Sequence, residues 1–284
     1  MTNPAAARPL TIGFSPCPND TFIFYALLHG KIDLPGIELA APMLADVETL
    51  NCWGLEHRLD VSKLSFHALG HVLDEYCVLS AGSALGRGCG PLLVARRFLD
   101  LTTPERYRVA IPGRLTTAAF LLRLFLPECV DLVEMRFDTI MAAVQQGHVD
   151  AGVIIHESRF TYQQMALVCL QDLGQWWEQR TGHPIPLGCI AARRSLGPER
   201  IAVIDQAIRD SITWAFAHPD GCLSYIRAHA QELEDRVVQE HIGLYVNDFS
   251  KDLGVEGLAA IDAFLDHGRA AGILPQSCDK VKSH

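Results

Sequence analysis

The sequence predicts an α/β protein with a mostly parallel sheet, and three observations along the chain support this class. Short apolar runs typical of strands alternate with patterns typical of helices from residue 10 to about residue 193. From about Pro198 the pattern is helical almost to the end. Two similar strings, GPLLVARR at residues 90–97 and LGCIAARR at residues 187–194, bracket a self-contained β-α-β-α-β block. We expect the chain to cross between two domains at these strings.

Two crossings make the first domain discontinuous. We predict a larger α/β domain from residues 1–97 and 194–284, which ends in the helical tail, and a smaller inserted α/β domain from residues 98–193. Short apolar strings also resemble one another by coincidence, and no repeat recurs at a fixed period. If the crossings hold, a cleft lies between the two domains.

The individual elements follow from local patterns in chain order. Short apolar runs bounded by Gly, Pro or Asp predict strands. They lie at residues 10–15, 37–43, 59–65, 76–84, 90–97, 107–113, 130–137, 150–156, 165–173 and 187–194. Longer runs with helical spacing, several of them behind an Asp or Thr suited to a helix start, predict helices. They lie at residues 20–30, 46–58, 65–76, 116–127, 137–148 and 174–182, ahead of the helical tail.

Charge and motif content limit the class of ligand. The formal net charge of −9 gives no basic surface for nucleic acid or for an anionic membrane, although a local basic pocket can lie under an acidic total. Neither a G-x-x-x-x-G-K-[ST] loop nor a G-x-G-x-x-G loop is present, so we expect no nucleotide cofactor. The expected partner is a small molecule, and the sequence leaves monomer and homodimer open.

Cysteine usage and the N-terminal segment bear on location. Nine cysteines, odd in number and never in C-x-x-C spacing, disfavour a disulfide framework and a zinc site. The first residues lack the charged and apolar segments of a secretory signal, and no later stretch approaches the roughly 18 apolar residues of a membrane span. We therefore expect a cytoplasmic protein whose cysteines are mostly buried and reduced.

The corner SPCPND at residues 15–20 joins a predicted strand to a predicted helix. Its two prolines stiffen the backbone, and Asn19 or Asp20 offers oxygen acceptors to the free N–H groups at the helix start. Such a corner is a place where α/β proteins hold ligands, although a well-capped turn without a ligand explains the same residues. Cys17 is either a nucleophile with a lowered pKa or a small side chain buried in a tight turn.

Two further strand-to-helix junctions carry groups that bind anions. In IPGRLTTAAFLL, Thr116 or Thr117 suits a helix start, where free N–H groups, the helix dipole and two hydroxyl donors can bind a carboxylate. In LDVSKLSFHALGH, the hydroxyls of Ser62 and Ser65 and the ammonium of Lys63 can face one anion together with nearby N–H groups. Capped helices with nothing bound account equally well for both junctions.

His156 in DAGVIIHESRFTY stands at the carboxyl end of a predicted buried strand, where open α/β sheets place ligands. An imidazole with an ordinary pKa of about 6.5 is the natural general base at neutral pH, and Glu157 or Ser158 orients it if the chain bends there. The order H-E-S-R-F does not match the zinc-protease pattern H-E-x-x-H. The alternative is a structural histidine that hydrogen-bonds the end of the strand.

Several strings taken together resemble one enzyme family. They are SPCPNDTFIFYALLHGK, DVETLN, SKLS, TTA and IIHESRFTY, with SALGRG at residues 83–88 close to that family's GALGRG. The chain resembles the 1,4-dihydroxy-6-naphthoate synthase family, the lyases of the futalosine route to menaquinone. The resemblance extends from about Leu10 through the helical tail and leaves out only the first nine residues and the last few.

This resemblance implies a periplasmic-binding-protein-like (type II) fold with two α/β domains, two hinge strands and a central cleft. It also implies conversion of cyclic dehypoxanthine futalosine to 1,4-dihydroxy-6-naphthoate without a redox cofactor or a metal. In that family the residue matching His156 is the proton acceptor. Those matching Lys63, Leu64, Ser65, Thr116 and Thr117 contact substrate, and Ser15, Asn19 and Asp20 of the corner are expected to line the cleft.

Two other functions stay open on the same fold. One is a cytoplasmic protein that binds or senses a small carboxylate, which needs the cleft but not the base. The other is a chorismate-dehydratase-like enzyme of the same route, although that family is not expected to carry the string IIHESRFTY. Turnover of the cyclic futalosine derivative separates an enzyme from a sensor.

Overall fold

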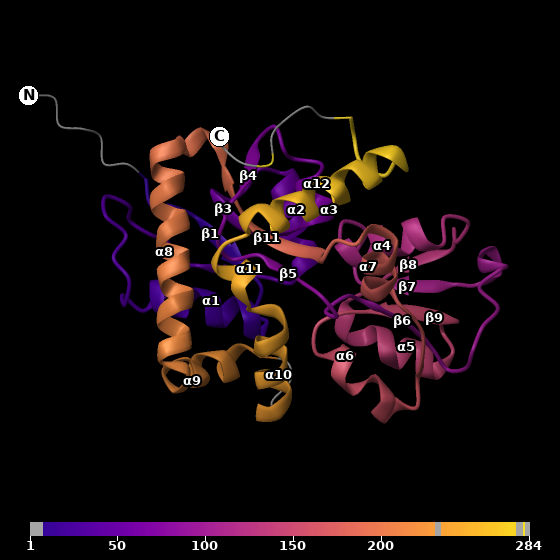
Figure 1. Cartoon of the computed structure of the whole chain (residues 1–284). Coiled ribbons are helices and arrows are strands. Elements are labelled where there is room, and N and C mark those ends of the chain that lie inside the picture. The colour runs from indigo at the N-terminus through magenta and orange to yellow at the C-terminus, as the bar shows by residue number, and fades with distance from the viewer. Residues whose placement is uncertain (1–7, 231–233, 277–280, 282–284) are drawn as a thin grey trace, which may run out of the picture.

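The structure, a computed structural model, describes residues 8–230, residues 234–276 and residue 281. Its strands form two separate sheets, each in a lobe of its own (Figure 1). The first sheet contains β1 (Ile12–Phe14), β2 (Met43–Leu44), β3 (Val61–Ser65), β4 (Tyr76–Val78), β5 (Ala84–Gly86) and β11 (Ile185–Arg193). Its order is β2-β1-β3-β11-β4, and β5 also pairs with β11.

The second sheet lies in the other lobe. It contains β6 (Leu92–Ala95), β7 (Val109–Ile111), β8 (Leu132–Glu134), β9 (Ala151–Ile154) and β10 (Val168–Asp172), in the order β10-β6-β9-β7-β8. The predicted α/β class is confirmed, but the prediction of mostly parallel pairing is wrong, because both sheets are mixed. β11 runs antiparallel to β3, β4 and β5, and β6 runs antiparallel to β9 and β10.

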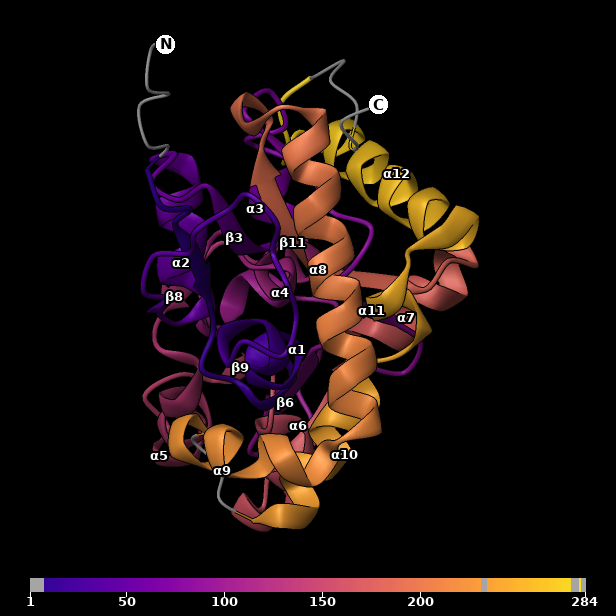
Figure 2. The same cartoon turned by 90° about the vertical axis from the view of Figure 1, so that its left-hand side faces the viewer.

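Helices cover both sheets, and the predicted helical tail is confirmed. In chain order the α-helices are α1 (Pro18–Leu28), α2 (Val47–Leu55), α3 (Phe66–Leu69), α4 (Thr117–Phe125), α5 (Ile140–Gln146), α6 (Ser158–Thr161), α7 (Leu173–Thr181), α8 (Pro198–Ala217), α9 (Pro219–His229), α10 (Asp235–Tyr245), α11 (Asp248–Lys251) and α12 (Gly254–Ala270). The helix predicted over residues 65–76 ends early, because the chain turns at Gly70 and His71. Figure 2 shows the long helix α8 running along the first lobe, where α11 packs against it.

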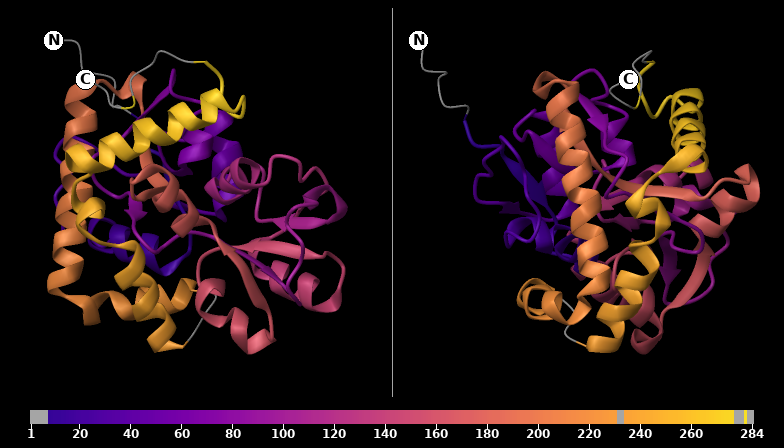
Figure 3. Two further views of the ribbon diagram at one scale, coloured as in Figure 1. Left: turned by 45° about the vertical axis from the view of Figure 1, so that its right-hand side comes forward. Right: turned by 60° about the vertical axis from the view of Figure 1, so that its left-hand side comes forward.

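The chain passes from the first sheet to the second after β5 and returns through β11 (Figure 3). β6 lies within residues 90–97, which we placed in the larger domain, yet it pairs only with strands of the second sheet. We therefore propose that the smaller domain begins near residues 87–91 and that the larger domain resumes within β11.

The tail helix α12 joins the two lobes through aromatic side chains. Phe264 of α12 stacks on Phe120 of α4, with ring centroids 4.0 Å apart, and lies 5.7 Å from the ring of Trp177 on α7. All three side chains are fully buried. Since α4 and α7 belong to the second lobe, one apolar cluster spans both lobes.

β3 is the strand that brings polar groups into this interior. It pairs with β1 on one side and β11 on the other, and all five of its residues are buried. Successive side chains of a strand point to opposite faces, so Lys63 and Ser65 share one face while Leu64 faces the other. Among the described residues, no helix is both long enough and apolar enough to cross a membrane.

Candidate active site

A pocket lies between the two lobes, and its empty space, together with the open solvent at its mouth, amounts to about 640 Å³. Its walls come from the corner after β1 and from α1, α2, β3 and β5 of the first lobe, from α4 and the residues after β9 in the second, and from β11 and α10. The lining residues are Ser15, Asn19, Asp20, Val47, Lys63, Ser65, Ala84, Cys89, Pro91, Thr116, Thr117, Ala118, Ile155, His156, Leu187, Gly188 and Tyr245. The structure thus brings together eight of the nine side chains that we predicted from the sequence.

Leu64 is the one predicted residue that does not line the pocket. Its side chain is fully buried and points to the opposite face of β3 from Lys63 and Ser65. There it packs so closely on α2 that a β-carbon added to Gly54 would meet it at 2.7 Å. The Leu64 side chain therefore belongs to the core beneath the site.

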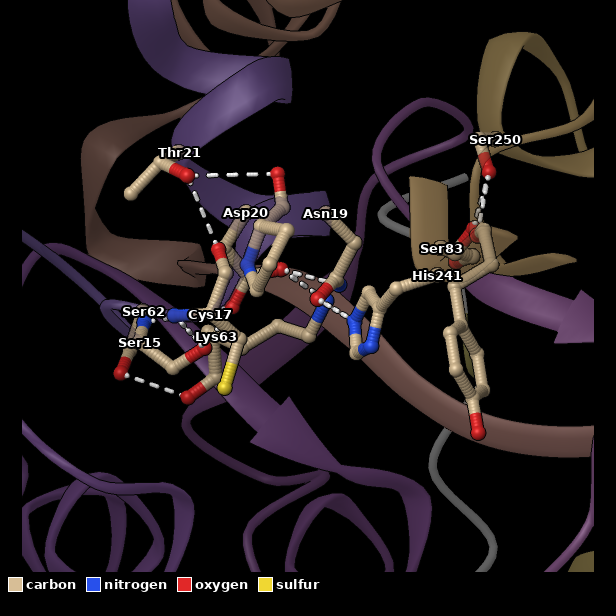
Figure 4. Close-up of polar contacts among 12 residues, drawn as sticks. Ser15, Cys17, Asn19, Asp20, Thr21, Ser62, Lys63, Ser83, His241 and Ser250 are labelled. Carbon is tan, nitrogen blue, oxygen red and sulfur yellow. Dashed lines mark hydrogen bonds and ion pairs between the residues drawn. The ribbon is translucent and has the colours of Figure 1, made fainter. Parts of the chain in front are cut away.

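The corner that follows β1 is organised by the carboxylate of Asp20 (Figure 4). One oxygen, Oδ2, accepts hydrogen bonds from Ser15 Oγ at 2.6 Å and Ser15 N at 3.2 Å. The other, Oδ1, accepts from Asn19 Nδ2 at 2.8 Å and Lys63 Nζ at 2.6 Å. Our expectation that Asn19 or Asp20 caps the helix is wrong, because α1 begins at Pro18 behind Cys17 and has no side-chain cap.

Lys63 forms half of a buried ion pair. Its side chain is 7 % exposed and that of Asp20 is 1 % exposed. Each charge lies where water cannot solvate it well, so the partner compensates it. We infer that Lys63 presents a largely neutralised ammonium to the pocket, whereas the sequence alone suggested a free cation for an anionic ligand.

Ser65 keeps a free hydroxyl proton above this pair. Asn51 holds the residue on both sides, since its Nδ2 donates to Ser65 Oγ at 3.1 Å and its Oδ1 accepts from Ser65 N at 2.8 Å. Glu48 in turn accepts from Asn51 Nδ2 at 3.2 Å and from the N–H of Leu115 in the other lobe at 2.9 Å. No acceptor for the Ser65 hydroxyl proton occurs in the part of the chain that the structure describes, so this proton is available to a ligand.

The N-terminus of α4 offers backbone donors. Thr116 is the N-cap, and its Oγ1 accepts from Ala119 N and donates to Gly113 O at 2.7 Å. Thr117 Oγ1 donates to Leu187 O at 2.7 Å. Both hydroxyl protons are already used, which corrects our expectation that they bind a carboxylate. The remaining donors are the N–H groups of Thr117 and Ala118, which the helix itself leaves without acceptors.

Ser65→Ala is expected to raise KM about 10-fold or more with little change in kcat, because a hydrogen bond to a charged ligand contributes about 1.5–3 kcal/mol. Steady-state kinetics on the substrate measures both constants. Ser62→Ala is the matched control on the same strand, since the Ser62 hydroxyl donates to Lys63 O outside the pocket lining. An unchanged KM in Ser65→Ala would exclude the hydroxyl as a ligand donor.

His156 lies at the second-lobe wall of the pocket, two residues after β9 ends. Its backbone has φ of +56°, a left-handed conformation that is uncommon outside glycine and clusters at functional sites. The ring lies edge-on to Phe137, with centroids 5.0 Å apart, and near-parallel to His241 at 6.1 Å. Within residues 8–230, 234–276 and 281, no hydrogen bond to the imidazole is found, so orientation by Glu157 or Ser158 is not supported.

Burial keeps the His156 imidazole neutral. The residue is only partly buried, and desolvation is the main cause that lowers the pKa of its ring to about 4. The charge of Asp20 opposes this shift, and that of Lys63 adds to it. At neutral pH the side chain is therefore a free base with an unprotonated ring nitrogen.

Cys17 lies beside this histidine as a protonated thiol. Burial, together with the charge of Glu157, raises its pKa well above the ordinary value, which disfavours a thiolate nucleophile. Ligand atoms of Cys17, His156 and Glu157 all lie within 4.8 Å of one another, the one group among the described residues with this metal-binding character. Because a metal needs the thiolate form and burial opposes it, we assign no metal site here.

Cys17→Ser is expected to keep most of the wild-type kcat, because the thiol is protonated and Ser fits the same tight turn. The measurement is kcat with circular dichroism as the check on folding. A loss of several orders of magnitude in folded protein would restore the thiol as a nucleophile.

The sequence did not point to Tyr245 or His241, which both lie on α10. Tyr245 lines the pocket, and burial raises the pKa of its hydroxyl. The amphipathic pattern of the tail shows which face of α10 is buried but not which distant residues it meets. Glu48 and Asn51 could have been identified from the sequence, because both lie in DVETLN, one of the strings that carry the family resemblance.

Comparisons with known proteins agree on one family. A family described as menaquinone biosynthesis matches residues 10–270. A protein from Thermus thermophilus named 1,4-dihydroxy-6-naphthoate synthase is 54% identical over 268 residues, covering 94% of this chain and 97% of the relative. A protein of the same name from Streptomyces coelicolor is 45% identical over 275 residues, covering 95% and 96%.

Solved structures agree on the fold. A protein from Archaeoglobus fulgidus, 34% identical, superposes with a TM-score of 0.89 and covers 95% of this chain and 100% of its own. The alkanesulfonate-binding protein of Xanthomonas axonopodis, bound to MOPS, has a TM-score of 0.71 at 13% identity and covers 96% of both chains. At that identity the likeness concerns the fold alone, which is periplasmic-binding-protein-like.

Proposed function

The chain belongs to the menaquinone-biosynthesis family, and from that premise we propose that it is a carbon–carbon lyase that converts cyclic dehypoxanthine futalosine to 1,4-dihydroxy-6-naphthoate. Two relatives named 1,4-dihydroxy-6-naphthoate synthase support the product. The substrate and the lyase class rest on the resemblance of the site strings and on the chemistry of the pocket.

The observation that carries the proposal is a neutral imidazole at the pocket wall. Aromatising the new ring requires removal of an acidic carbon-bound proton as the sugar-derived fragment leaves. His156 lines the pocket, and desolvation lowers its pKa to about 4, so the ring is unprotonated at physiological pH and has a nitrogen available to take the substrate proton. We propose His156 as the general base of this step.

Substrate orientation falls to groups on the opposite walls. The free N–H groups of Thr117 and Ala118 suit the carboxylate of the naphthoate portion, because helix N-termini favour anions. Ser65 adds a hydroxyl donor from the first lobe. Donors from both lobes would hold the reacting carbon against His156, which favours an otherwise slow proton transfer.

One base and a set of hydrogen-bond donors suffice for proton removal and fragment departure. We therefore propose a reaction without a redox cofactor or a metal, acting on a small-molecule carboxylate. A biosynthetic role among soluble intermediates also supports our proposal of a cytoplasmic location.

The test supplies cyclic dehypoxanthine futalosine to the purified protein and follows the absorbance of 1,4-dihydroxy-6-naphthoate. Formation of the naphthoate supports the proposal. Binding without turnover would instead favour a protein that binds or senses a small carboxylate. Turnover of chorismate in a parallel assay, with none of the futalosine derivative, would favour the chorismate-dehydratase-like alternative.

A further inference from the structure

His241 on α10 is a buried histidine next to the site that lines no part of the pocket. It is 0 % exposed, and its Nε2 lies 2.9 Å from Oδ1 of Asn19, a residue 222 positions earlier in the chain. Figure 4 shows the ring of His241 turned toward Asn19, and Asp20 and Lys63 on the other side of Asn19. The C-terminal tail thus reaches the polar corner at the start of α1.

The hydrogen-bond partners determine which ring nitrogen carries the proton. Asn19 Nδ2 donates to the carboxylate of Asp20 at 2.8 Å, so the amide oxygen of Asn19 must face His241. An amide oxygen only accepts hydrogen bonds, and Nε2 of His241 must therefore carry a hydrogen. Nδ1 of His241 has no hydrogen-bond partner among the residues that the structure describes, as suits an unprotonated nitrogen.

The contact with Asn19 extends to the ion pair beneath the pocket. With its oxygen held by His241, the Asn19 amide keeps its N–H group on Asp20 Oδ1, which also accepts from Lys63 Nζ. Without His241, the amide is free to rotate and Asp20 loses one of its four donors. The charges that face His156 across the pocket then become less well fixed.

The ring of His241 also supports His156 directly. The two rings are inclined by 24° with centroids 6.1 Å apart, and Phe137 contacts the His156 ring edge-on. The other groups that face His241 are Tyr245, with ring centroids 4.6 Å apart, and Lys63. Burial, with His156 and Lys63 nearby, lowers the pKa of His241 well below its usual range. A neutral ring at this position adds no charge that would oppose protonation of His156.

We propose that His241 is a positioning residue for the proton transfer: as the Nε2–H tautomer it holds Asn19, and through it the Asp20–Lys63 pair, while its ring fixes the His156 ring. The expected effect of His241 on the reaction rate rests on the proposed function. The assignment of the Nε2–H tautomer does not. It assigns a role in the site to the C-terminal tail, which contributes no proposed catalytic residue.

The kinetic test compares two replacements of His241. His241→Phe keeps a ring but removes the donor, and we expect kcat to fall about 10- to 100-fold, because small misplacements of reacting groups have effects of this size. KM should change little, since the donors of α4 and Ser65 stay in place. His241→Gln restores an N–H group near the position of Nε2 and should recover most of the lost rate.

Val238→Ala is the matched control, because Val238 is buried one turn earlier on α10 and belongs to the apolar core. It should lower Tm and leave kcat of the folded protein unchanged. Wild-type kcat in His241→Phe, or a His241→Gln variant that is folded but no faster than His241→Phe, would overturn the proposal. If the wild-type protein turned over no futalosine derivative, the proposed function would fail instead.

A second measurement uses the wild-type protein, so it depends neither on enzymatic activity nor on the folding of a variant. Long-range ¹H–¹⁵N spectra of the histidine-labelled wild-type protein should show His241 protonated at Nε2 and bare at Nδ1, without titration between about pH 5 and 8. An Nδ1–H tautomer, or titration within that range, would overturn the assignment.

Discussion

His156→Asn is expected to lower kcat by roughly 10²- to 10⁴-fold, the contribution typical of one general base, while substrate binding largely survives. Asn keeps a polar side chain of similar reach but cannot accept the proton. The donors that we propose for the substrate, on α4 and Ser65, are untouched, so KM should change little. Steady-state kinetics and a separate binding measurement by calorimetry give the two quantities.

His71→Asn is the control for this variant. His71 is a half-buried histidine outside the pocket, and burial lowers its pKa too, so the substitution is chemically matched. It should leave kcat unchanged. Near-normal kcat with lost affinity in His156→Asn would make His156 a binding residue and move the base to Asp20 or Glu157.

Asp20→Ala is expected to lower the free energy of unfolding by about 3–5 kcal/mol, because it leaves the Lys63 ammonium buried without its counter-charge. It also removes the acceptor of Ser15 and Asn19. The double variant Asp20→Ala/Lys63→Met should recover much of this loss, since apolar replacements of buried ion pairs are often close to neutral. Urea unfolding followed by circular dichroism measures both.

An exposed ion pair provides the comparison. Glu240→Ala removes the contact with Arg236 on the surface of α10, where both side chains are at least 42% exposed. Its cost should be about 0.3–0.5 kcal/mol, the value for exposed pairs one helical turn apart. Equal costs for Asp20→Ala and Glu240→Ala would show that the buried pair does not stabilise the fold in the way we describe.

Local patterns predicted most elements and most of the pocket. The run LDVSKLS is the buried strand β3, and alternation along it already places Lys63 and Ser65 on one face. The strings SPCPND, TTA and IIHESRFTY all supply pocket residues. These signals were available because each string combines a strand end with polar groups, and strand ends meet at one edge of a sheet.

Local patterns did not predict which polar groups within the site form hydrogen bonds and ion pairs with one another. Asp20 looked like a helix cap, but Lys63 lies 43 residues away and competes for the same carboxylate. The sequence predicted the hydroxyls of Thr116 and Thr117 as ligand donors. In the structure they donate to the carbonyls of Gly113 and Leu187 instead. Such outcomes depend on tertiary contacts that no local spacing encodes.

The tail shows the same limit on a larger scale. Its amphipathic helices were evident, yet the contacts of His241 with Asn19 and of Phe264 with Phe120 join segments far apart in the chain. A helical period indicates that one face of the helix is buried, but it does not show which residues that face packs against. Tyr245 and His241 reach the site because α10 packs beside α1, and the sequence pattern does not predict this contact.

The pH dependence of kcat/KM in the wild-type protein tests the central claim most directly. A base works only when unprotonated, and burial lowers the pKa of His156 to about 4. The rate constant should therefore stay nearly level from neutral pH into the acid range and reach half its maximum near that pKa. Circular dichroism at each pH is needed, because His67, with a pKa of about 4, is also buried neutral and favours unfolding as it protonates in acid. A fall centred near the ordinary histidine pKa of about 6.5 in folded protein would contradict a desolvated His156 with a lowered pKa as the base.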